Sequence, residues 1–295
     1  MHFKINTMTK QNYIFFILTI LSLFSLQAQD DLLLEIEKET NKNPKFNLPA
    51  FKAMQIGNLQ STKIANKGDL YLIVAHRFGA ISDGVDEFFG LDQANTKIQL
   101  LYSFWDGVQM SLSRDSFEKT YSGALKIGLT KQTKNFPLNI VFYGSADINS
   151  EIKTSQYPAL KFGDRMGYSF QLLTSKRISK NLSLQVAPIF VRQNLQDLNF
   201  TKARSHNQMI MGMGGRLKVS KRMSLNLDYA LNFSRNKNSK FSNPLTIGLD
   251  LETGGHVFQL IFTNARGSND TAFLTKAAGN WFKNISFGFN VVRVF

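Results

Sequence analysis

Apolar and polar residues alternate along most of this chain from Gly68 onward. In the segment 121–130, Tyr121, Leu125 and Leu129 share one face, and polar residues such as Lys126 fall on the other. A repeat of two is the spacing of a β-strand with one apolar face. Turn signals separate twelve such segments. They cover residues 69–78, 94–104, 108–115, 121–130, 138–146, 165–175, 182–192, 208–219, 223–232, 245–252, 256–263 and 285–295.

The connections between these segments alternate between longer and shorter ones. The long connections are 79–93, 147–164, 193–207, 233–244 and 264–284, the connection 116–120 is of moderate length, and the short ones are 105–107, 131–137, 176–181, 220–222 and 253–255. Bacterial membrane barrels have long outer loops and short periplasmic turns, whereas a soluble Greek-key sandwich has no reason to alternate in this way. The sequence therefore predicts an all-β fold: a closed antiparallel up-and-down transmembrane β-barrel of about twelve strands over residues 68–295.

The last predicted strand ends the chain on an aromatic residue. Phe287, Phe289 and Val291 lie on one apolar face, and the chain stops at Phe295. A terminal aromatic on such a strand resembles the signal by which outer-membrane barrels are handed to the barrel-insertion machinery. We interpret Phe287, Phe289, Val291 and Phe295 as that insertion signal. The alternative is the closing strand of a soluble sandwich or barrel.

The beginning of the chain has the layout of a secretory signal peptide. Two lysines precede an apolar run from Tyr13 to Leu26, and Ala28 supplies a small residue at a plausible cleavage site. The run is short for a membrane-spanning helix. We assign residues 1–28 to a signal peptide cleaved near Ala28, and residues 29–67 to a periplasmic leader. The leader is expected to hold a short helix over 30–40, followed by an extended segment over 41–67 that either lines the barrel as a plug or lies beneath it.

Composition limits the classes of function. The chain has no cysteine, which excludes disulfides, thiol catalysis and cysteine-based zinc sites. The formal net charge is +14, but the basic residues gather in short turns rather than on one helix or groove, so nucleic-acid binding is not expected. The turn residues, which the topology places on one side of the membrane, are Lys131, Lys134, Lys176, Arg177, Lys180, Lys221 and Arg222.

Several motifs in fixed order resemble one known family. They are His76-Arg77-Phe78-Gly79, the runs 86–94, 116–121 and 252–260, and the closing run 287–295. Together they resemble a Bacteroidota family of β-barrel proteins classed as a domain of unknown function, number 5777 in that series, over about residues 50–295. The resemblance implies an outer-membrane barrel. It implies no established substrate or reaction, so no functional residue is carried over.

The inward faces of the predicted strands carry charges of both signs. The lumen-lining candidates are Arg77, Lys97, Lys126, Arg165, Arg216, Lys218, Asp115, Asp228, Asp250 and Glu252. In one interpretation they line a narrow hydrated pore that slightly favours anions; in the other they pair across the lumen and hold a plugged barrel shut. Small inward residues such as Gly128, Gly212 and Gly214 leave room for a pore, unless residues 41–67 occupy it. The glycines of 212–215 otherwise mark a bend or a close backbone approach.

Metal and catalytic sites have weaker support. Asp83, Asp86 and Glu87 provide oxygen atoms that suit calcium, but their spacing differs from that of an EF-hand, and a capped loop folded onto the barrel mouth is the competing interpretation. After the signal peptide the histidines are His76, His206 and His256, and no Gly-x-Ser-x-Gly elbow or glycine-rich phosphate loop accompanies them. We therefore expect no enzyme and no cofactor.

These observations together predict a monomeric or small-oligomeric barrel in the outer membrane of a Gram-negative bacterium, surrounded by outer-membrane lipid. The first hypothesis for its function is a narrow channel or uptake component for small solutes. The second is a non-conducting structural barrel that binds a periplasmic partner. The third is an outer-membrane hydrolase.

Overall fold

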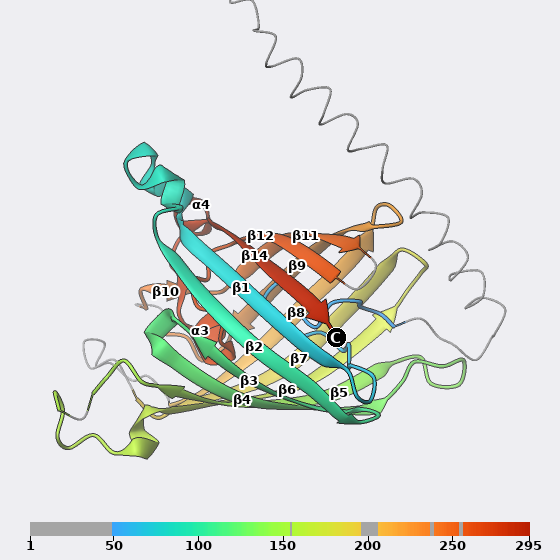
Figure 1. Cartoon of the computed structure of the whole chain (residues 1–295), viewed down its shortest axis with the longest axis horizontal. Helices are drawn as coiled ribbons and strands as arrows, with labels where there is room; N and C mark the ends of the chain where they lie inside the picture. The colour runs from blue at the N-terminus through green and yellow to red at the C-terminus, as the bar shows by residue number, and fades with distance from the viewer. Residues whose placement is uncertain (1–48, 154, 196–205, 237–238, 254–255) are drawn as a thin grey trace, which may run out of the picture. The chain divides into compact units, whose positions relative to one another are not determined.

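The computed structural model describes residues 49–153, 155–195, 206–236, 239–253 and 256–295. Pro49 to Phe295 form one compact unit. Within the described residues, twelve antiparallel strands form a closed up-and-down barrel (Figure 1). This confirms the predicted fold class. The proposed signal peptide, the helix expected over 30–40 and the rest of the leader up to residue 48 lie outside the described residues.

Each predicted segment corresponds to one strand, with ends that differ by at most a few residues. The strands are β1 (Leu70–Ala80), β2 (Ala94–Trp105), β3 (Val108–Asp115), β4 (Thr120–Thr130), β5 (Asn139–Asn149), β6 (Met166–Arg177), β7 (Leu182–Gln193), β8 (Asn207–Lys218), β9 (Met223–Asn232), β11 (Leu245–Thr253), β12 (His256–Thr263) and β14 (Ser286–Val294). β1 pairs with β14, with Tyr71 opposite Val294 and Arg77 opposite Gly288. The first and last strands therefore meet, and the barrel has no free edge.

Smaller elements lie in the connections. A two-stranded sheet joins β10 (Phe241–Ser242) to β13 (Ala277–Ala278). The 3-10 helices are η1 (Ile81–Asp83), η2 (Val85–Gly90), η3 (Phe117–Lys119) and η4 (Phe162–Arg165), and the α-helices are α3 (Asp270–Thr275) and α4 (Trp281–Asn284). No helix among the described residues is long and apolar enough to span a membrane.

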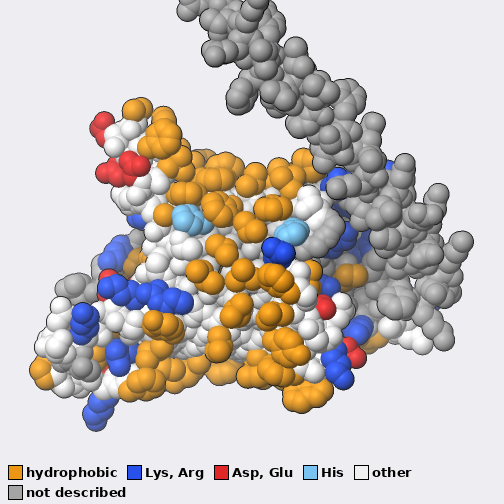
Figure 2. All heavy atoms as spheres, in the orientation of Figure 1, with side chains coloured by type: hydrophobic (Ala, Val, Ile, Leu, Met, Phe, Trp, Pro, Cys, Tyr) orange, Lys and Arg blue, Asp and Glu red, His pale blue; other side chains and the backbone are white. Residues whose placement is uncertain are grey.

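The barrel turns its apolar side chains outward. On β2, Ile98 and Leu100 are more than half exposed, whereas the alternating Lys97 and Gln99 are buried inside. Figure 2 shows apolar side chains gathered over the strands on the face that carries β1, β2 and β14. In water this arrangement would be unfavourable. In lipid it is stable, because the closed ladder pairs the backbone groups of the strands with one another and the apolar side chains contact acyl chains.

The lengths of the connections between strands alternate along the barrel between long and short, with one exception. We call the end that holds 81–93, 150–165 and 264–285 the outer end, and the end near Leu70 and Phe295 the inner end. The outer connection 116–119 is shorter than the inner connection 131–138, although the sequence suggested the reverse. Glu118 and Lys119 both adopt left-handed backbone conformations, with φ of 51° and 47°, which makes this outer turn tight.

Candidate functional site

The lumen of the barrel is filled by two segments that are not part of the strand ladder. Residues 49–67, which we call the inner insert, precede β1. They fold back on themselves at Gly57-Asn58, where Ile56 N–H donates to the Leu59 carbonyl at 2.8 Å and Gln55 forms a β-bridge with Gln60. A glycine followed by an asparagine suits such a tight reversal.

One carboxylate of the wall holds this turn. The backbone N–H groups of Gly57, Asn58 and Leu59 donate to Asp228 Oδ2 at 2.8, 2.9 and 3.3 Å. Asp228 lies on β9 and is 1% exposed. Successive backbone N–H groups that converge on one anionic oxygen form a favourable anion-binding geometry. The carboxylate therefore satisfies three backbone donors that would otherwise be buried without partners.

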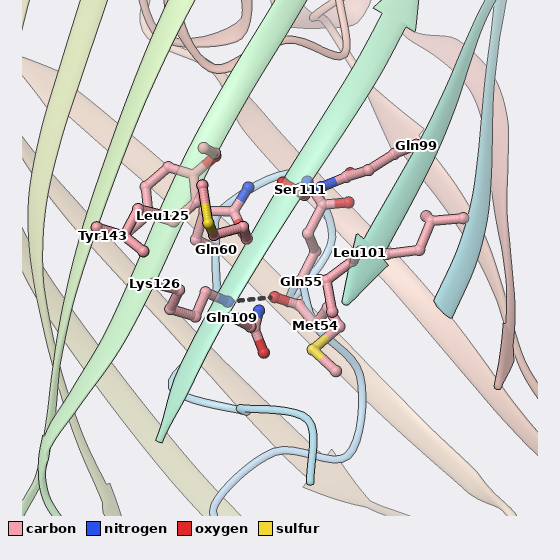
Figure 3. Close-up of a pocket in the computed structure, with 13 residues that line it drawn as sticks. Met54, Gln55, Gln60, Gln99, Leu101, Gln109, Ser111, Leu125, Lys126 and Tyr143 are labelled. Atoms are coloured by element: carbon pink, nitrogen blue, oxygen red, sulfur yellow. Dashed lines mark hydrogen bonds between the residues drawn. The ribbon is translucent and has the colours of Figure 1, made fainter. Parts of the chain in front are cut away.

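Two cations of the wall bind the same insert. The Arg77 guanidinium donates to Asn58 Oδ1 at 2.8 and 3.3 Å. Lys126 Nζ donates to the carbonyl oxygens of Ser61 at 3.0 Å and of Met54 and Lys63 at 3.4 Å. Figure 3 shows the Lys126 side chain reaching from the wall to the main chain at Met54. Both inward charges thus bind groups of the insert, and Arg77 also donates to the wall carbonyls of His76 and Phe289.

Glycines of β8 make room for the apolar side chains of the insert. A Cβ atom on Gly214 would lie 2.6 Å from Ile56 Cδ1, and one on Gly212 would lie 3.3 Å from the Leu59 methyl groups. Ile56 and Leu59 are both buried. The glycine cluster therefore marks a close approach, one of the two alternatives expected from the sequence, and the approaching group is the insert.

A bulkier residue at this notch should displace the insert without breaking the barrel. We expect Gly214→Val, made together with a Ser61→Cys reporter, to raise the rate of maleimide labelling at position 61 about tenfold, since overpacking costs about 1–3 kcal/mol. Ser61 is fully buried in the native arrangement. Gly215→Val is the matched control, because its Cβ would meet the tip of Leu184 instead of the insert. Equal labelling rates in the two variants would contradict this role for Gly214.

The second segment, residues 264–285, enters from the outer end and is called the outer insert. It carries α3, whose N-cap Asn269 accepts a hydrogen bond from Ala272 N–H at 2.9 Å. Asp115 Oδ2 accepts from Ser268 N–H at 2.8 Å and Asn269 N–H at 2.9 Å. Lys97 Nζ donates to the Ser268 carbonyl at 3.2 Å. A buried carboxylate thus holds the outer insert in the same way as Asp228 holds the inner one.

The two inserts meet inside the barrel at Asp270. Its carboxylate accepts hydrogen bonds from Tyr143 Oη at 2.7 Å, Gln171 Nε2 at 3.2 Å and Gln60 Nε2 at 3.3 Å. Tyr143 and Gln171 belong to the wall, and Gln60 belongs to the inner insert. The contact makes one hydrogen-bonded path from the outer insert to the inner insert.

The lumen also has an apolar side. Inward-facing residues of β5 to β9 pack with Leu59 of the inner insert and with Phe273 and Leu274 of α3. The wall residues of this cluster are Val141, Tyr143, Leu173, Ala187, Ile189, Val191, Ile210 and Ala230. They form a hydrophobic core inside the barrel, which fixes α3 against this part of the wall.

A small cavity lies beside the inner insert. Its volume is about 10 Å³, and it lies between the insert and the strands β1 to β5 (Figure 3). Its lining includes Met54, Gln60, Gln109, Lys126 and Tyr143. This volume holds about one water molecule, so the cavity is not a path for solutes in this conformation.

Salt bridges join the inner insert to the wall near the inner end of the lumen. Glu252 receives Lys52 Nζ at 2.6 Å and also pairs with Arg216, so the wall and the insert share one carboxylate. Burial lowers the pKa of the Lys63 ammonium, and the nearby Asp69 carboxylate acts in the opposite direction.

The structure places most of the predicted lumen candidates inside the barrel. Arg77, Lys97, Lys126, Arg216, Asp115, Asp228 and Asp250 are buried, and Lys218 lies on the same face of β8 as Arg216, two residues nearer the inner end. Asp250 accepts from Gln259 Nε2 at 2.8 Å. Arg165 is different: it ends η4 in an outer connection and lies over the Phe162 ring, because the strand starts one residue later than expected.

The other candidate residues lie apart from the lumen. Asp83, Asp86 and Glu87 do not converge as a metal-binding group in the described part of the chain. Asp83 instead caps the loop by accepting from Ala80 N–H at 3.2 Å. His76 faces outward, where it stacks on Phe289 at 5.2 Å and pairs with Thr96 Oγ1 at 2.9 Å. His206 Nδ1 lies 2.9 Å from the Gln193 carbonyl. Phe287, Phe289 and Val291 share the outward face of β14, and Phe295 is exposed.

Sequence reasoning missed the outer insert entirely. The connection 264–284 was expected only as a long outer loop. A local signal was present, since Asn269-Asp270 provides an N-cap and an acidic first turn before Phe273 and Leu274. Nothing in that signal says that the short helix points into the lumen.

Comparison with known proteins agrees with this geometry. The model of a family described as a membrane-bound beta barrel domain (DUF5777) matches residues 51–295. The chain belongs to this family. The family match begins within the inner insert, so the membrane-bound barrel domain includes most of the segment that fills the lumen. No curated protein is similar enough in sequence to count as a match.

Solved structures share the fold at low sequence identity. The NanC porin aligns with a TM-score of 0.51 and 10% identity, over 76% of this chain and 98% of the porin. An outer membrane channel from Pseudomonas putida F1 aligns with a TM-score of 0.45 and 12% identity, over 79% of this chain and 97% of that chain. Outer membrane phospholipase A from Escherichia coli aligns with a TM-score of 0.41 and 12% identity, over 77% of this chain and 90% of the phospholipase chain. At such identities the comparison shows the fold of a membrane barrel and no more.

Proposed function

We propose that this membrane-bound barrel is an outer-membrane channel of narrow bore for small hydrophilic solutes, closed in the conformation described above by its inner insert together with the outer insert, of which the inner insert is the part that moves. The insert precedes β1 and contributes no strand to the barrel ladder. It is therefore able to leave the lumen without breaking any hydrogen bond between strands. Its attachment consists of contacts with side chains of the wall, one hydrogen bond to Asp270 of the outer insert, and the packing of Leu59 in the apolar cluster with Phe273 and Leu274.

The observation that carries this proposal is the polarity of the wall behind the insert. Gln109 accepts from Ala65 N–H at 2.8 Å, Gln185 donates to the Gln60 carbonyl at 2.7 Å, and Gln259 donates to the Ile56 carbonyl at 3.1 Å. With Asp228 and Lys126, these side chains would face water once the insert moves away. A polar lining keeps a narrow lumen hydrated, whereas an apolar constriction dewets.

The location is part of the proposal. A membrane-bound β-barrel with this fold and these alternating connections fits the outer membrane of a Gram-negative bacterium, with the inner end toward the periplasm. The resemblance of the sequence motifs to Bacteroidota proteins supports an origin in that group.

A non-conducting barrel that binds a partner is the second candidate. The apolar cluster of β5 to β9 with Leu59, Phe273 and Leu274 favours it, because a core of this kind stabilises a permanently filled lumen. The two candidates differ in one respect: whether the inner insert ever leaves.

A reversible disulfide between the inner insert and the wall tests whether movement of the insert opens the channel. A Cβ atom on Gly57 would lie 3.3 Å from Thr246 Cβ, close to the separation that a disulfide spans, and the chain has no native cysteine. We expect Gly57→Cys/Thr246→Cys in planar bilayers to show small, brief conductance steps when reduced and none when oxidised, with recovery after reduction. The single-cysteine variants under the same oxidant are the controls.

Two results would count against the channel. Conductance that is the same in the oxidised and reduced states would show that solutes bypass the insert. Absence of conductance in both states, and also in a variant whose insert is shown to be released, would favour the non-conducting barrel.

A further inference from the structure

Three neighbouring turns at the inner end concentrate positive charge. The turns 131–138, 178–181 and 219–222 join β4 to β5, β6 to β7 and β8 to β9. Because these strands are consecutive in the wall, the turns lie side by side. With the end of β6 they carry the basic arc, defined as Lys131, Lys134, Lys176, Arg177, Lys180, Lys221 and Arg222, and no aspartate or glutamate interrupts them.

The arc is confined to one side of the barrel. On the opposite side of the inner end, Asp69 precedes β1 and Asp106 lies in the turn between β2 and β3, and the exposed basic residues Lys67 and Arg293 accompany them. The inner end therefore presents one sector whose turns are only basic and another sector of mixed charge. Positive charge spread evenly around the inner end would not define a binding surface. A continuous basic sector does, and it favours an anionic partner.

The basic side chains continue the lipid-facing surface of the barrel. Lys176 follows Phe170 and Leu172 on the outward face of β6, and all three are exposed. Ile178 and Val219, in the second and third turns, are about half exposed. A lysine at the edge of an apolar belt lies along it with its methylene groups and places its ammonium at the depth of lipid phosphates.

Hydrogen bonds fix the arc in shape. Arg177 N–H donates to Gln132 Oε1 at 2.8 Å, and Gln132 Nε2 donates to the Arg177 carbonyl at 3.1 Å, so the first two turns are joined. The Arg177 guanidinium donates to the Lys180 carbonyl at 2.8 Å and holds the second turn. The lysines of the arc are exposed, so they project from a rigid base.

From these observations we propose that the basic arc binds the anionic headgroups of phospholipids in the leaflet at the inner end of the barrel. The apolar residues between the lysines favour a lipid over an acidic soluble protein, because they require contact with acyl chains. The proposal depends on the barrel being membrane-bound and not on whether it conducts.

Native mass spectrometry of the folded full-length protein in mild detergent tests the arc. The probes are phosphatidylglycerol and phosphatidylcholine with the same acyl chains, offered at equal concentration. We expect about a tenfold preference for phosphatidylglycerol, since several lysines act on one anionic headgroup. Replacing Lys131, Lys134, Lys176, Lys180 and Lys221 with glutamine should abolish this preference.

The chain offers a matched control at the outer end. Lys119, Lys153, Lys161, Lys240 and Lys283 are also exposed, and their replacement with glutamine removes the same charge from the opposite end. The control variant should keep the preference, and the shift in gel mobility on heating should show that both variants are folded. Equal loss in the two variants would overturn the proposal. No preference in the native protein would also overturn it and would leave an acidic protein as the occupant of the arc.

Discussion

Replacing Asp228 with alanine should release the inner insert and raise the open probability of the barrel in planar bilayers about a hundredfold. The carboxylate accepts hydrogen bonds from Gly57, Asn58 and Leu59, and its removal leaves three buried donors without this partner. Each such loss costs about 1–3 kcal/mol, so a total near 3 kcal/mol is a conservative value. Single-channel recording measures the open probability directly.

The effect of Asp228→Ala has a control and an independent readout. Asp228→Asn keeps an acceptor oxygen without the charge, and it should produce a smaller effect. A Ser61→Cys reporter should become accessible to maleimide in the alanine variant even in a barrel that does not conduct. If Asp228→Ala changes neither labelling nor conductance, the carboxylate does not hold the insert.

Phe273→Ala should lower the free energy of unfolding by about 3–5 kcal/mol, the usual cost of truncating a buried phenylalanine. Phe273 is 2% exposed and packs with Leu274 in the apolar cluster inside the lumen. Equilibrium unfolding in urea and detergent, followed by the fluorescence of the two tryptophans, measures the change.

Phe282→Ala in the same outer insert is the matched control for this prediction. Phe282 is 85% exposed, so its truncation should change the free energy of unfolding by less than about 0.5 kcal/mol. Similar losses in the two variants would show that the outer insert stabilises the barrel through something other than the core around α3.

The strands were predictable because their signal is local. A membrane barrel places every second side chain against lipid. The alternation within a ten-residue segment such as 223–232 is therefore enough to identify the strand and its two faces. The count of such segments gave the strand number, and the alternating lengths of the connections agreed with an even number that places both ends of the barrel on one side. The inward position of Lys126 and Asp228 followed from the same alternation, without any knowledge of their partners.

The filling of the lumen was harder to predict from the sequence, because it depends on contacts between residues that are far apart in the chain. Occupation of the barrel by residues 41–67 was one of the alternatives expected from the sequence, but the sequence offered no means to pair Asp228 with a turn at residue 57. The outer insert was harder still. Its attachment through Asp115 joins residues more than 150 positions apart, and no periodic pattern reports such a contact.

The apolar side of the lumen could not be predicted from the sequence for a different reason. Val141 and Leu173 point inward, yet their strands also carry apolar residues on the lipid side, such as Phe142 and Leu172. A strand that is apolar on both faces loses the alternation that marks the inside. The sequence therefore showed where the strands lie more clearly than it showed which wall would support a helix.

Closure of β1 against β14 also bears on how the molecule is assembled. The inner insert runs directly into β1, and the outer insert runs directly into β14. Both inserts are thus tethered to the two strands whose pairing closes the barrel. We therefore expect the lumen to be filled in the same step of assembly that closes the wall.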